Sequence, residues 1–501
     1  MLTPKDIKAL IDADRSSERR QRAAIGQRYY EGLHDILDFR MFYFNDDDEL
    51  VEDTTSANTR IPHPFFTELA DQLAPYMLSF PEDSPPIRAK LKDPKAADDL
   101  QELLDAYFDD DFWAEIGELI TGAYVKGVEY IYAYKNEDDR LAFQCADSMG
   151  VVEVREKDTD SGTACMLYWY VDRIDKGKKE IIRIQAHTAD SITFYVQSGQ
   201  NGRVVLDDEV SPNPRPNVVY TDSEGKKYGK PLGFVPFWPL PLNKKRVPGL
   251  MPIKRIIDDY DMMKCGLSNN LQDFDHPIYA VKGFDGHDFK ALAKNLRTKK
   301  MVGTGEQGGI DVVTTEIPVE ARKANLEEDE KNIYKFGMGF NASQVGDGNI
   351  TNVVILSRYT LLDLKADKVE KPLKKLLKQL ARPVLDEINA EHGTAYTVRD
   401  IEIKFKRVLP TNESEDIENE YKKAQTKELQ TNTILNVAAS IGDEATLEAI
   451  CEVMDWDLDK IKAQIKEAQE DTPEAAEAIL QQVVTDDEPE AETGPAVPAG
   501  R

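Results

Sequence analysis

One apolar stripe that recurs at helical spacing between residues 353 and 388 constrains the fold more than any other feature of this sequence. A single helix carrying it would span about 55–60 Å at about 1.5 Å per residue, so the chain must contain one very long element. We expect Pro372 and Pro383 to kink this helix, because each removes a backbone donor and clashes with the preceding turn. The stripe consists of Val353, Leu356, Leu361, Leu364, Val369, Leu373, Leu376, Leu380, Val384 and Ile388.

Two further helical patterns enclose a small α/β insertion over residues 276–317. Apolar residues at spacings of three and four predict the first helix over residues 253–274, and charged residues predict the second over residues 320–337. A polar loop with two glycines, residues 341–352, then leads into the long helix. The elements expected within the insertion are a strand at 278–282, a helix at 288–297, a strand at 300–302 and a strand at 311–315.

The remainder of the chain predicts an α+β body at the N-terminal end and short helices at the other. Residues 1–245 combine helical periods, expected over 5–37, 65–77, 96–108 and 112–126, with strand patterns between 128 and 220. Ile401, Ile403 and Phe405 alternate with charged residues and predict one half-exposed strand. Residues 413–470 predict short helices. The last 31 or so residues are rich in alanine, proline and acids, and we expect a disordered tail there.

Net charge and composition exclude several classes of protein. The 501 residues include 92 acidic and 63 basic side chains, a formal net charge of −29, whereas a protein whose whole surface grips nucleic acid is expected to be basic. Hydrophobic residues make up 41% of the chain, enough for real cores. No apolar run approaches the roughly 20 residues of a membrane helix, and we expect no secretion signal. Four widely spaced cysteines form no disulfide framework or zinc motif and indicate a reducing cytosol.

Motifs that carry chemistry are missing where they would be expected in an enzyme. The glycine-rich stretch 303–309 is not followed by the Lys-Ser/Thr pair of a phosphate-binding loop, and a strand rather than a helix is expected after it. The six histidines are scattered. Asp46-Asp47-Asp48 lacks the glycine and bidentate acid of a calcium loop, which favours a solvated loop. We therefore expect no catalytic residues, no metal and no cofactor.

Several short motifs accompany this order of parts. They are Tyr29-Tyr30-Glu31-Gly32 with Asp35-Ile36, the segment from Asn58-x-Arg60 to Tyr76, Lys126–Tyr130, Gly233–Phe237, Asp273–Val281, Lys299–Pro318 with Gly308-Gly309-Ile310-Asp311, and Tyr359–Ala366. In order and spacing, from about residue 25 to 470, the chain resembles tailed-bacteriophage portal proteins of the siphophage type. One departure concerns the loop before the long helix, where relatives often have a Ser/Thr-Gly-x-Ala run and this chain has Thr351-Asn352-Val353-Val354.

The resemblance implies an α+β, mainly helical fold with four named regions: an α+β wing, a helical stem, a small α/β clip and a helical crown. Mapped onto this sequence, the regions are the wing (1–245), stem helix one (246–275), the clip (276–317), stem helix two (318–340), the tunnel loop (341–352), the long kinked helix with a wing strand (353–410), the crown (411–470) and an acidic disordered tail (471–501).

The function implied by the resemblance is a ring, usually of twelve subunits, at one capsid vertex. Double-stranded DNA passes through the ring during packaging and ejection. The implied partners are further copies of the chain, the terminase large subunit, a head–tail adaptor, and the major capsid and scaffolding proteins. No membrane is involved, and the implied location is the virion, with assembly in the host cytoplasm. Two alternatives remain open from the residues alone: an intracellular scaffold or adaptor without DNA transit, and a metal-dependent DNA-processing enzyme.

Three sets of residues become candidates for function. The tunnel loop contains no lysine or arginine and one acid, so it should trap phosphates weakly; its candidates are Asn341, Ser343, Gln344, Asp347, Asn349, Thr351 and Asn352. The clip is locally basic and should face a partner, which is the motor and adaptor by the resemblance or acids of the adjacent subunit as the alternative; its candidates are Lys282, Lys290, Lys294, Arg297, Lys299 and Lys300. Charges of the stem and the long helix should pair between subunits, through Glu327, Glu328, Asp329, Glu330, Lys365, Lys368 and Lys371.

Overall fold

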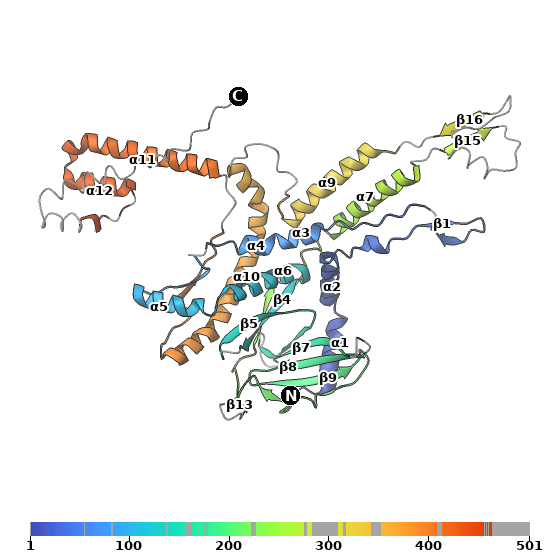
Figure 1. Ribbon diagram of the computed structural model, residues 1–501, viewed down its shortest axis with the longest axis horizontal. Coiled ribbons are helices and arrows are strands. Elements are labelled where there is room, and N and C mark those ends of the chain that lie inside the picture. The colour runs from blue at the N-terminus through green and yellow to red at the C-terminus, as the bar shows by residue number, and fades with distance from the viewer. Residues whose placement is uncertain are drawn as a thin grey trace, which may run out of the picture. The chain divides into compact units, whose positions relative to one another are not determined.

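The computed structural model of the chain (Figure 1) divides into two compact units. Unit 1 comprises Met1–Gly348 and Val354–Leu409, and unit 2 comprises Asn349–Val353 and Pro410–Arg501. Helices dominate and several small sheets accompany them, which confirms the predicted α+β, mainly helical class. The structure describes residues 2–54, 56–81, 84–136, 139–156, 162–174, 177, 179–221, 227–274, 278–282, 309–313, 317–341, 352–407, 413–454, 456, 458 and 460–462.

Two helices begin the chain where the sequence pattern predicts one. The break falls after Ser16, because the Ser17 side chain accepts a hydrogen bond from the Arg20 N–H and caps a new helix. Gly32 ends the second helix as predicted, with φ +74° and its N–H bonded to the Tyr29 carbonyl. The elements of this region are α1 (Pro4–Arg15), α2 (Glu18–Tyr30), the 3-10 helix η1 (Asp35–Asp38), β1 (Phe42–Phe44) and β2 (Leu50–Glu52).

The main core of unit 1 is helical. Its helices are α3 (Phe65–Asp71), α4 (Leu73–Met77), α5 (Pro94–Asp105), α6 (Asp110–Lys126) and α10 (Asn352–His392). Leu119 and Ile120 of α6 and Leu373 and Leu380 of α10 are fully buried in one hydrophobic cluster. Burial of this kind contributes roughly 1.5–3 kcal/mol for each large apolar side chain, so the packing of α6 and α10 stabilises the unit.

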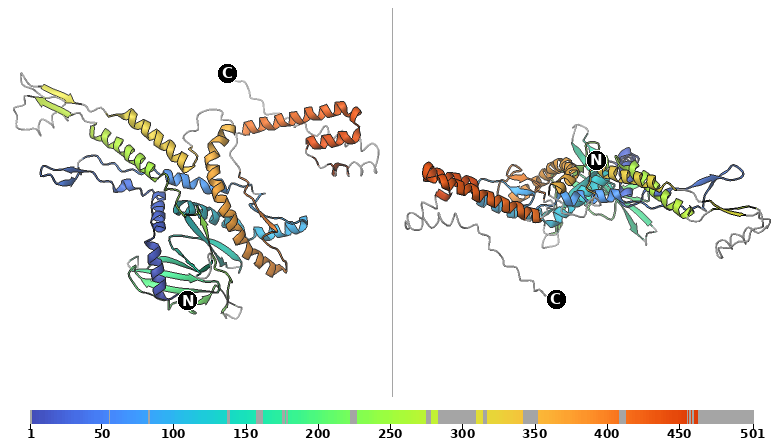
Figure 2. Two further views of the ribbon diagram at one scale, coloured as in Figure 1. Left: turned by 180° about the vertical axis from the view of Figure 1, so that it is seen from behind. Right: turned by 90° about the horizontal axis from the view of Figure 1, so that it is seen from above.

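Helix α10 confirms the long element predicted from the apolar stripe. It runs for 41 residues, about 61 Å at about 1.5 Å per residue. Pro372 and Pro383 both lie inside the helix, which continues past them. Figures 1 and 2 show α10 following a bent course, in keeping with the missing backbone donors at the two prolines.

Four further sheets accompany the helical core of unit 1, and the pair β12–β13 is one of them. Successive side chains of β4 point to opposite faces of its sheet, and both faces are buried. Tyr130 packs with Met166 on one face, while Ile131 packs with the helical core on the other. A central sheet runs β14-β4-β5, and a larger one runs β10-β9-β8-β7-β6 with β11 on β9. β17 pairs with β3, as the predicted half-exposed strand. The strands are β3 (Ile87–Ala89), β4 (Val128–Lys135), β5 (Leu141–Ala146), β6 (Val151–Arg155), β7 (Thr163–Ile174), β8 (Lys179–His187), β9 (Ser191–Ser198), β10 (Val204–Leu206), β11 (Arg215–Pro216), β12 (Val218–Thr221), β13 (Lys227–Lys230), β14 (Phe237–Pro241) and β17 (Ile401–Ile403).

A helix pair occupies the two segments for which stem helices are predicted. α7 (Lys254–Phe274) and α9 (Val319–Gly337) lie side by side, as Figures 1 and 2 show, and both predicted helices are confirmed within a few residues. At their far end, β15 (Ile278–Lys282) pairs antiparallel with β16 (Gly309–Val313), which confirms the outer strands of the insertion. The predicted helix at 288–297 and strand at 300–302 lie outside the described residues.

Unit 2 is helical in its described part. The sequence pattern predicts short helices here, and that is wrong for the first of them, because α11 (Glu413–Ile441) runs for 29 residues before Gly442, with φ +84°, ends it. α12 (Asp443–Met454) follows. The predicted acidic tail lies outside the described residues. Among the described helices of the whole chain, none combines the length and hydropathy that crossing a membrane requires.

Candidate functional site

The acidic residues predicted for contacts between subunits differ in their surroundings on α9. Glu327 and Glu328 are exposed. Asp329 is half-buried, accepts a hydrogen bond from Asn325 Nδ2 at 3.2 Å and lies against Asp259 of α7. Burial and the neighbouring Asp259 carboxylate raise the pKa of Asp329 to about 6. Glu327 and Glu328 thus face outward, whereas Asp329 takes part in the contact between α7 and α9.

The fourth acid of α9 fixes the start of the predicted tunnel loop. Glu330 Oε1 accepts a hydrogen bond from Asn341 Nδ2 at 3.0 Å, which ties the first loop residue to the stem. Asn352, the last predicted loop residue, begins α10. The other candidates of the loop lie outside the described residues: Ser343, Gln344, Asp347, Asn349 and Thr351.

Only the edge of the predicted clip site falls in the described part of the chain. Lys282 is the last residue of β15 and pairs with Gly309 of β16. The remaining candidates lie outside the described residues: Lys290, Lys294, Arg297, Lys299 and Lys300.

Lys365 corrects the prediction for the long helix. Its side chain is buried, at 5% exposure, because its position falls on the packed face of α10 next to Ala366. Lys365 Nζ donates to the carbonyl oxygens of Leu69 and Gly337, at 3.2 Å each, and lies 4.6 Å from the ring centre of Tyr124. Burial lowers the pKa of Lys365 to about 7. The expectation that Lys365 pairs with acids of another subunit is therefore wrong.

The other two basic candidates of α10 stay at the surface. Lys368 and Lys371 are exposed, and neither forms an ion pair with an acidic residue of the described chain. Lys368 Nζ reaches Met338 Sδ at 3.7 Å, a weak contact with the C-cap of α9. These two lysines remain available to a partner.

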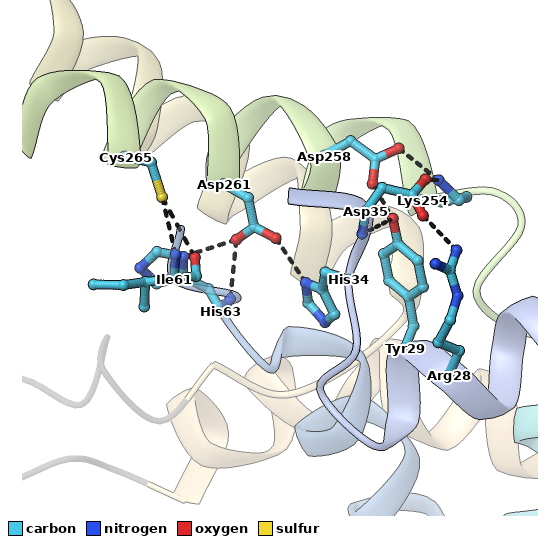
Figure 3. Close-up of polar contacts among 10 residues, drawn as sticks. All are labelled: Arg28, Tyr29, His34, Asp35, Ile61, His63, Lys254, Asp258, Asp261 and Cys265. Carbon is cyan, nitrogen blue, oxygen red and sulfur yellow. Dashed lines mark hydrogen bonds and ion pairs between the residues drawn. The ribbon is translucent and has the colours of Figure 1, made fainter. Parts of the chain in front are cut away.

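A buried carboxylate joins α7 to the N-terminal region (Figure 3). Asp261 is 1% exposed; its Oδ2 lies 2.6 Å from His34 Nδ1 and its Oδ1 lies 2.7 Å from His63 Nδ1. Burial raises the pKa of Asp261, but the hydrogen bonds from both histidines outweigh burial and hold the pKa below its usual range. The His34 ring stacks on Tyr29 with centroids 4.4 Å apart. One carboxylate therefore fixes two separate N-terminal segments to the stem helix.

The extended segment 57–63, here called the strap, is bonded along the length of α7. Every second backbone N–H of the strap meets a side-chain acceptor from every fourth residue of α7. Four residues of helix rise about 6.0 Å and two extended residues advance about 6.4–6.8 Å, so the two repeats match. The four bonds, which we call the α7 ladder, are Ala57 N to Asp273 Oδ1 at 2.9 Å, Thr59 N to Asn269 Oδ1 at 2.6 Å, Ile61 N to Cys265 Sγ at 3.3 Å and His63 N to Asp261 Oδ1 at 2.9 Å.

The first turn of α7 carries a second polar cluster (Figure 3). Lys254 Nζ lies 2.8 Å from Asp258 and 2.5 Å from Asp35. The Tyr29 hydroxyl donates to Asp258, and Arg28 donates to Asp35. Burial lowers the pKa of Lys254, but its hydrogen bonds to the two carboxylates outweigh burial and raise the pKa. This cluster anchors the start of the stem to the end of α2.

Sequence reasoning missed the ladder and both anchors. A signal was present, because acceptor side chains recur every fourth residue along α7, at Asp261, Cys265, Asn269 and Asp273, beside the apolar stripe. The partner of such a polar stripe is an extended backbone segment, which has no periodicity of its own to detect.

The polar groups of this arrangement are engaged in holding segments of the chain together. The carboxylate of Asp261 is already bonded by His34 and His63, and the acids near Lys254 are engaged by cations. Within the described residues, no group of three or more histidine, cysteine or acidic side chains could hold a metal ion. What the site provides is an attachment of α7 to the end of α2, to η1 and to the strap.

Comparisons with known proteins give one consistent result. The model of the family described as "Phage portal protein, SPP1 Gp6-like" matches residues 11–471. The chain is 25% identical over 399 residues to the portal protein of Bacillus phage SPP1, covering 79% of this chain and 76% of that protein. It is 24% identical over 433 residues to the portal protein of Clostridium phage phiCD119, covering 82% of this chain and 87% of that protein.

Proposed function

The chain belongs to the phage portal protein family, and from this premise we propose that twelve copies of it close into a ring around a channel for double-stranded DNA. The ring lies at one vertex of the capsid and serves both packaging and ejection of the genome. The match over residues 11–471 is the observation that carries the proposal, because it includes the stem pair α7–α9, the long helix α10 and the α7 ladder. The virion is the site of action, and assembly takes place in the host cytoplasm.

Weak attraction between the channel wall and double-stranded DNA favours passage of the DNA. Each copy carries a formal charge of −29, and duplex DNA carries one negative charge per roughly 1.7 Å, so the protein as a whole repels the duplex. We place the polar loop 341–352 at the narrowest point, where the absence of lysine and arginine keeps phosphate contacts short-lived. Its contributing residues are Asn341, Ser343, Gln344, Asp347, Asn349, Thr351 and Asn352.

A charge change in this loop tests its role. Replacing Asp347, Asn349 and Thr351 by lysine should slow DNA passage, because three cations per subunit would hold phosphates at each step. Packaging is measured as DNA translocated per second by purified particles. Ring assembly, checked by electron microscopy, should stay intact, and an unchanged packaging rate would argue against the loop as the constriction.

The insertion between the stem helices is the proposed docking surface for the terminase large subunit and later for the head–tail adaptor. Between residues 282 and 300 it contains six bases and two acids, the opposite balance to the chain as a whole. The bases are Lys282, Lys290, Lys294, Arg297, Lys299 and Lys300. Such a predominantly basic patch steers an acidic partner and fixes its orientation.

Reversing three of these charges tests the docking surface. The variant K294E/R297E/K299E should bind the motor more weakly, with the loss greatest at low salt because screening reduces the contribution of exposed charges. Motor-driven packaging and direct binding to the purified terminase are both measured. Normal ATP-driven packaging by the variant would count against this assignment.

Exposed charges of α9 and α10 are proposed to contribute to contacts between subunits. The residues that remain available for this role are Glu327 and Glu328 on α9 and Lys368 and Lys371 on α10. Pairs of this kind are worth only about 0–1 kcal/mol each, so apolar burial must supply most of the ring's stability. The major capsid and scaffolding proteins are the proposed partners around the finished ring.

Imaging decides the central proposal. Electron microscopy of the purified protein, averaged along the symmetry axis, should show an annulus with an open channel of about 20 Å or more, wide enough for a duplex. A protein that stays monomeric at high concentration, together with shells that contain no annular vertex, would refute the portal function.

A further inference from the structure

Helix α10 carries an exposed ridge of positive charge. Its five members, here called the basic ridge, recur at spacings of three and four residues, so they lie on one face of the helix over about 21 Å. None of them forms an ion pair with an acidic residue of the described chain. In a chain of net charge −29, a cationic ridge that has no acidic partner among the described residues is suited to an anionic surface of another molecule. The basic ridge consists of Lys368, Lys371, Lys375, Lys378 and Arg382.

The same chain carries a single-signed surface of the opposite charge. Residues 96–125 contain nine acids and no lysine or arginine. Six of these acids are exposed on α5 and on the first turn of α6, and none forms an ion pair in the described chain. These six, here called the acidic surface, are Asp98, Asp99, Glu102, Asp105, Asp110 and Asp111.

The two surfaces belong to opposite sides of α10. Tyr107, at the junction of α5 and α6, donates a hydrogen bond to Glu387 Oε1 of α10 at 3.0 Å. Glu387 is nine residues from Lys378, which places the two side chains about 180° apart around the helix. The junction of α5 and α6 therefore contacts the face of α10 opposite the basic ridge. At this contact the acidic surface and the basic ridge of one copy cannot neutralise each other.

We propose that the basic ridge of one copy docks on the acidic surface of the next copy around the ring. This inference rests on the proposed ring and assigns one of its contacts. A closed ring of identical subunits needs a heterologous contact, in which each copy presents two different, complementary surfaces on opposite sides. This contact takes Lys368 and Lys371 in place of a pairing with Glu327 and Glu328 of α9, which fit the ridge less well because Lys331 and Lys335 follow them on the same helix.

The shape of the acidic surface suits long basic side chains. A groove lined by Phe80 and Trp113, whose rings meet edge to face at 5.2 Å, is edged by Asp105 and Asp110. A lysine or arginine can lay its aliphatic stem on such rings while its charged head reaches the carboxylates. Arg88 also lines the groove, where it donates to a neighbouring backbone carbonyl. Each pair contributes little alone, so the contact mainly sets orientation and the rate of encounter.

Charge reversal on the full chain tests the contact. The ridge variant is K371E/K375E/K378E, the acid variant is D98K/E102K/D105K, and the matched control is D46K/D47K/D48K in the exposed β1–β2 turn. Ring assembly is followed by sedimentation velocity at 50 and 500 mM NaCl, with folding of each variant checked by circular dichroism. We expect the ridge and acid variants each to need roughly 10- to 100-fold more protein for half-assembly at low salt, and the control to match the unchanged protein.

Mixing the two defective variants gives the sharpest result. In an equal mixture, the reversed ridge of one variant faces the reversed acidic surface of the other, so alternating rings should form near the normal concentration. Failure of the mixture to recover, or normal assembly of either variant alone, would overturn the inference. If the ridge variant forms normal rings but binds DNA less well, DNA is the partner of the ridge and the inference is equally overturned. In each of those cases rings of the unchanged protein would leave the proposed function standing.

Discussion

Replacing Lys365 by methionine should change how the stability of unit 1 depends on pH. The buried ammonium caps the carbonyl oxygens of Leu69, near the end of α3, and Gly337, at the end of α9, at 3.2 Å each. Methionine has nearly the same volume and is one atom shorter, and it removes both the donor and the titratable group. The variant therefore isolates what a titrating amine contributes at the point where stem, wing and long helix meet.

The magnitude follows from the two pKa values of Lys365. Burial lowers its pKa to about 7 in the folded chain, against 10.5 for an ordinary lysine. Between these values the unfolded chain binds more protons than the folded chain, so stability rises with pH. From pH 7 to pH 9 the gain is about 2 kcal/mol. This contribution is complete above the unfolded pKa and is lost as the pH falls through the folded pKa.

Urea denaturation at pH 7, 8 and 9 measures this contribution when the unchanged protein and K365M are compared at each pH. Trp113, Trp169 and Trp238 lie in unit 1 and report its unfolding by fluorescence. The difference in unfolding free energy should grow by about 2 kcal/mol in favour of the unchanged protein between pH 7 and pH 9, because other groups cancel. K368M, at an exposed position, is the matched control and should show no such trend. Parallel pH profiles for the unchanged protein and K365M would refute the reasoning.

Two further substitution pairs test the packing around the stem and wing. D261N should destabilise unit 1 by about 3 kcal/mol or more, since it disrupts a buried charge network. D273N, at the exposed end of the ladder, should cost under about 1 kcal/mol. Equal losses of unfolding free energy in urea denaturation would contradict the central role of the buried carboxylate. G127A should cost more than about 2 kcal/mol, because φ is +87° and a Cβ would lie 2.3 Å from the Arg246 carbonyl oxygen. G233A, with φ +79° and open space around it, should cost about 1 kcal/mol. Thermal midpoints that fall equally in the two variants would rule out a contribution from the clash with Arg246.

The helices and strands with a regular apolar pattern could be predicted from the sequence, because the residues of that pattern lie on one buried face in the structure. The stripe ending at Ile388 gave α10, and Gly32 marked the end of α2 through its positive φ. The short break at Ser17 was harder to predict, since one capping side chain interrupts a helical period without altering it. In α11 the length was missed, because its apolar residues are too sparse to show a continuous stripe.

The polar contacts of the site could not be predicted in the same way. Lys365 belongs to a run of basic residues that looks uniform in sequence, and only its angle on α10 separates it from the exposed Lys368. The bridge from Asp261 to His34 and His63 depends on segments that are far apart in the chain. Periodicity describes one element at a time, so a contact between an aperiodic strap and a helix leaves no trace in either alone.

Because the helical repeat of α7 matches the extended repeat of the strap, the strap can bond to α7 only at positions one rung apart. Sliding residues 57–63 along α7 brings donors and acceptors back into line only after a whole rung, about 6 Å, where three of the four bonds can re-form, and intermediate positions leave every rung unmade at once. Inserting one residue near Thr59 would turn the amides on one side of the insertion away from the helix. The strap and α7 should accordingly move as one piece, so that a tilt of α7 displaces the whole of residues 57–63 together rather than one bond at a time.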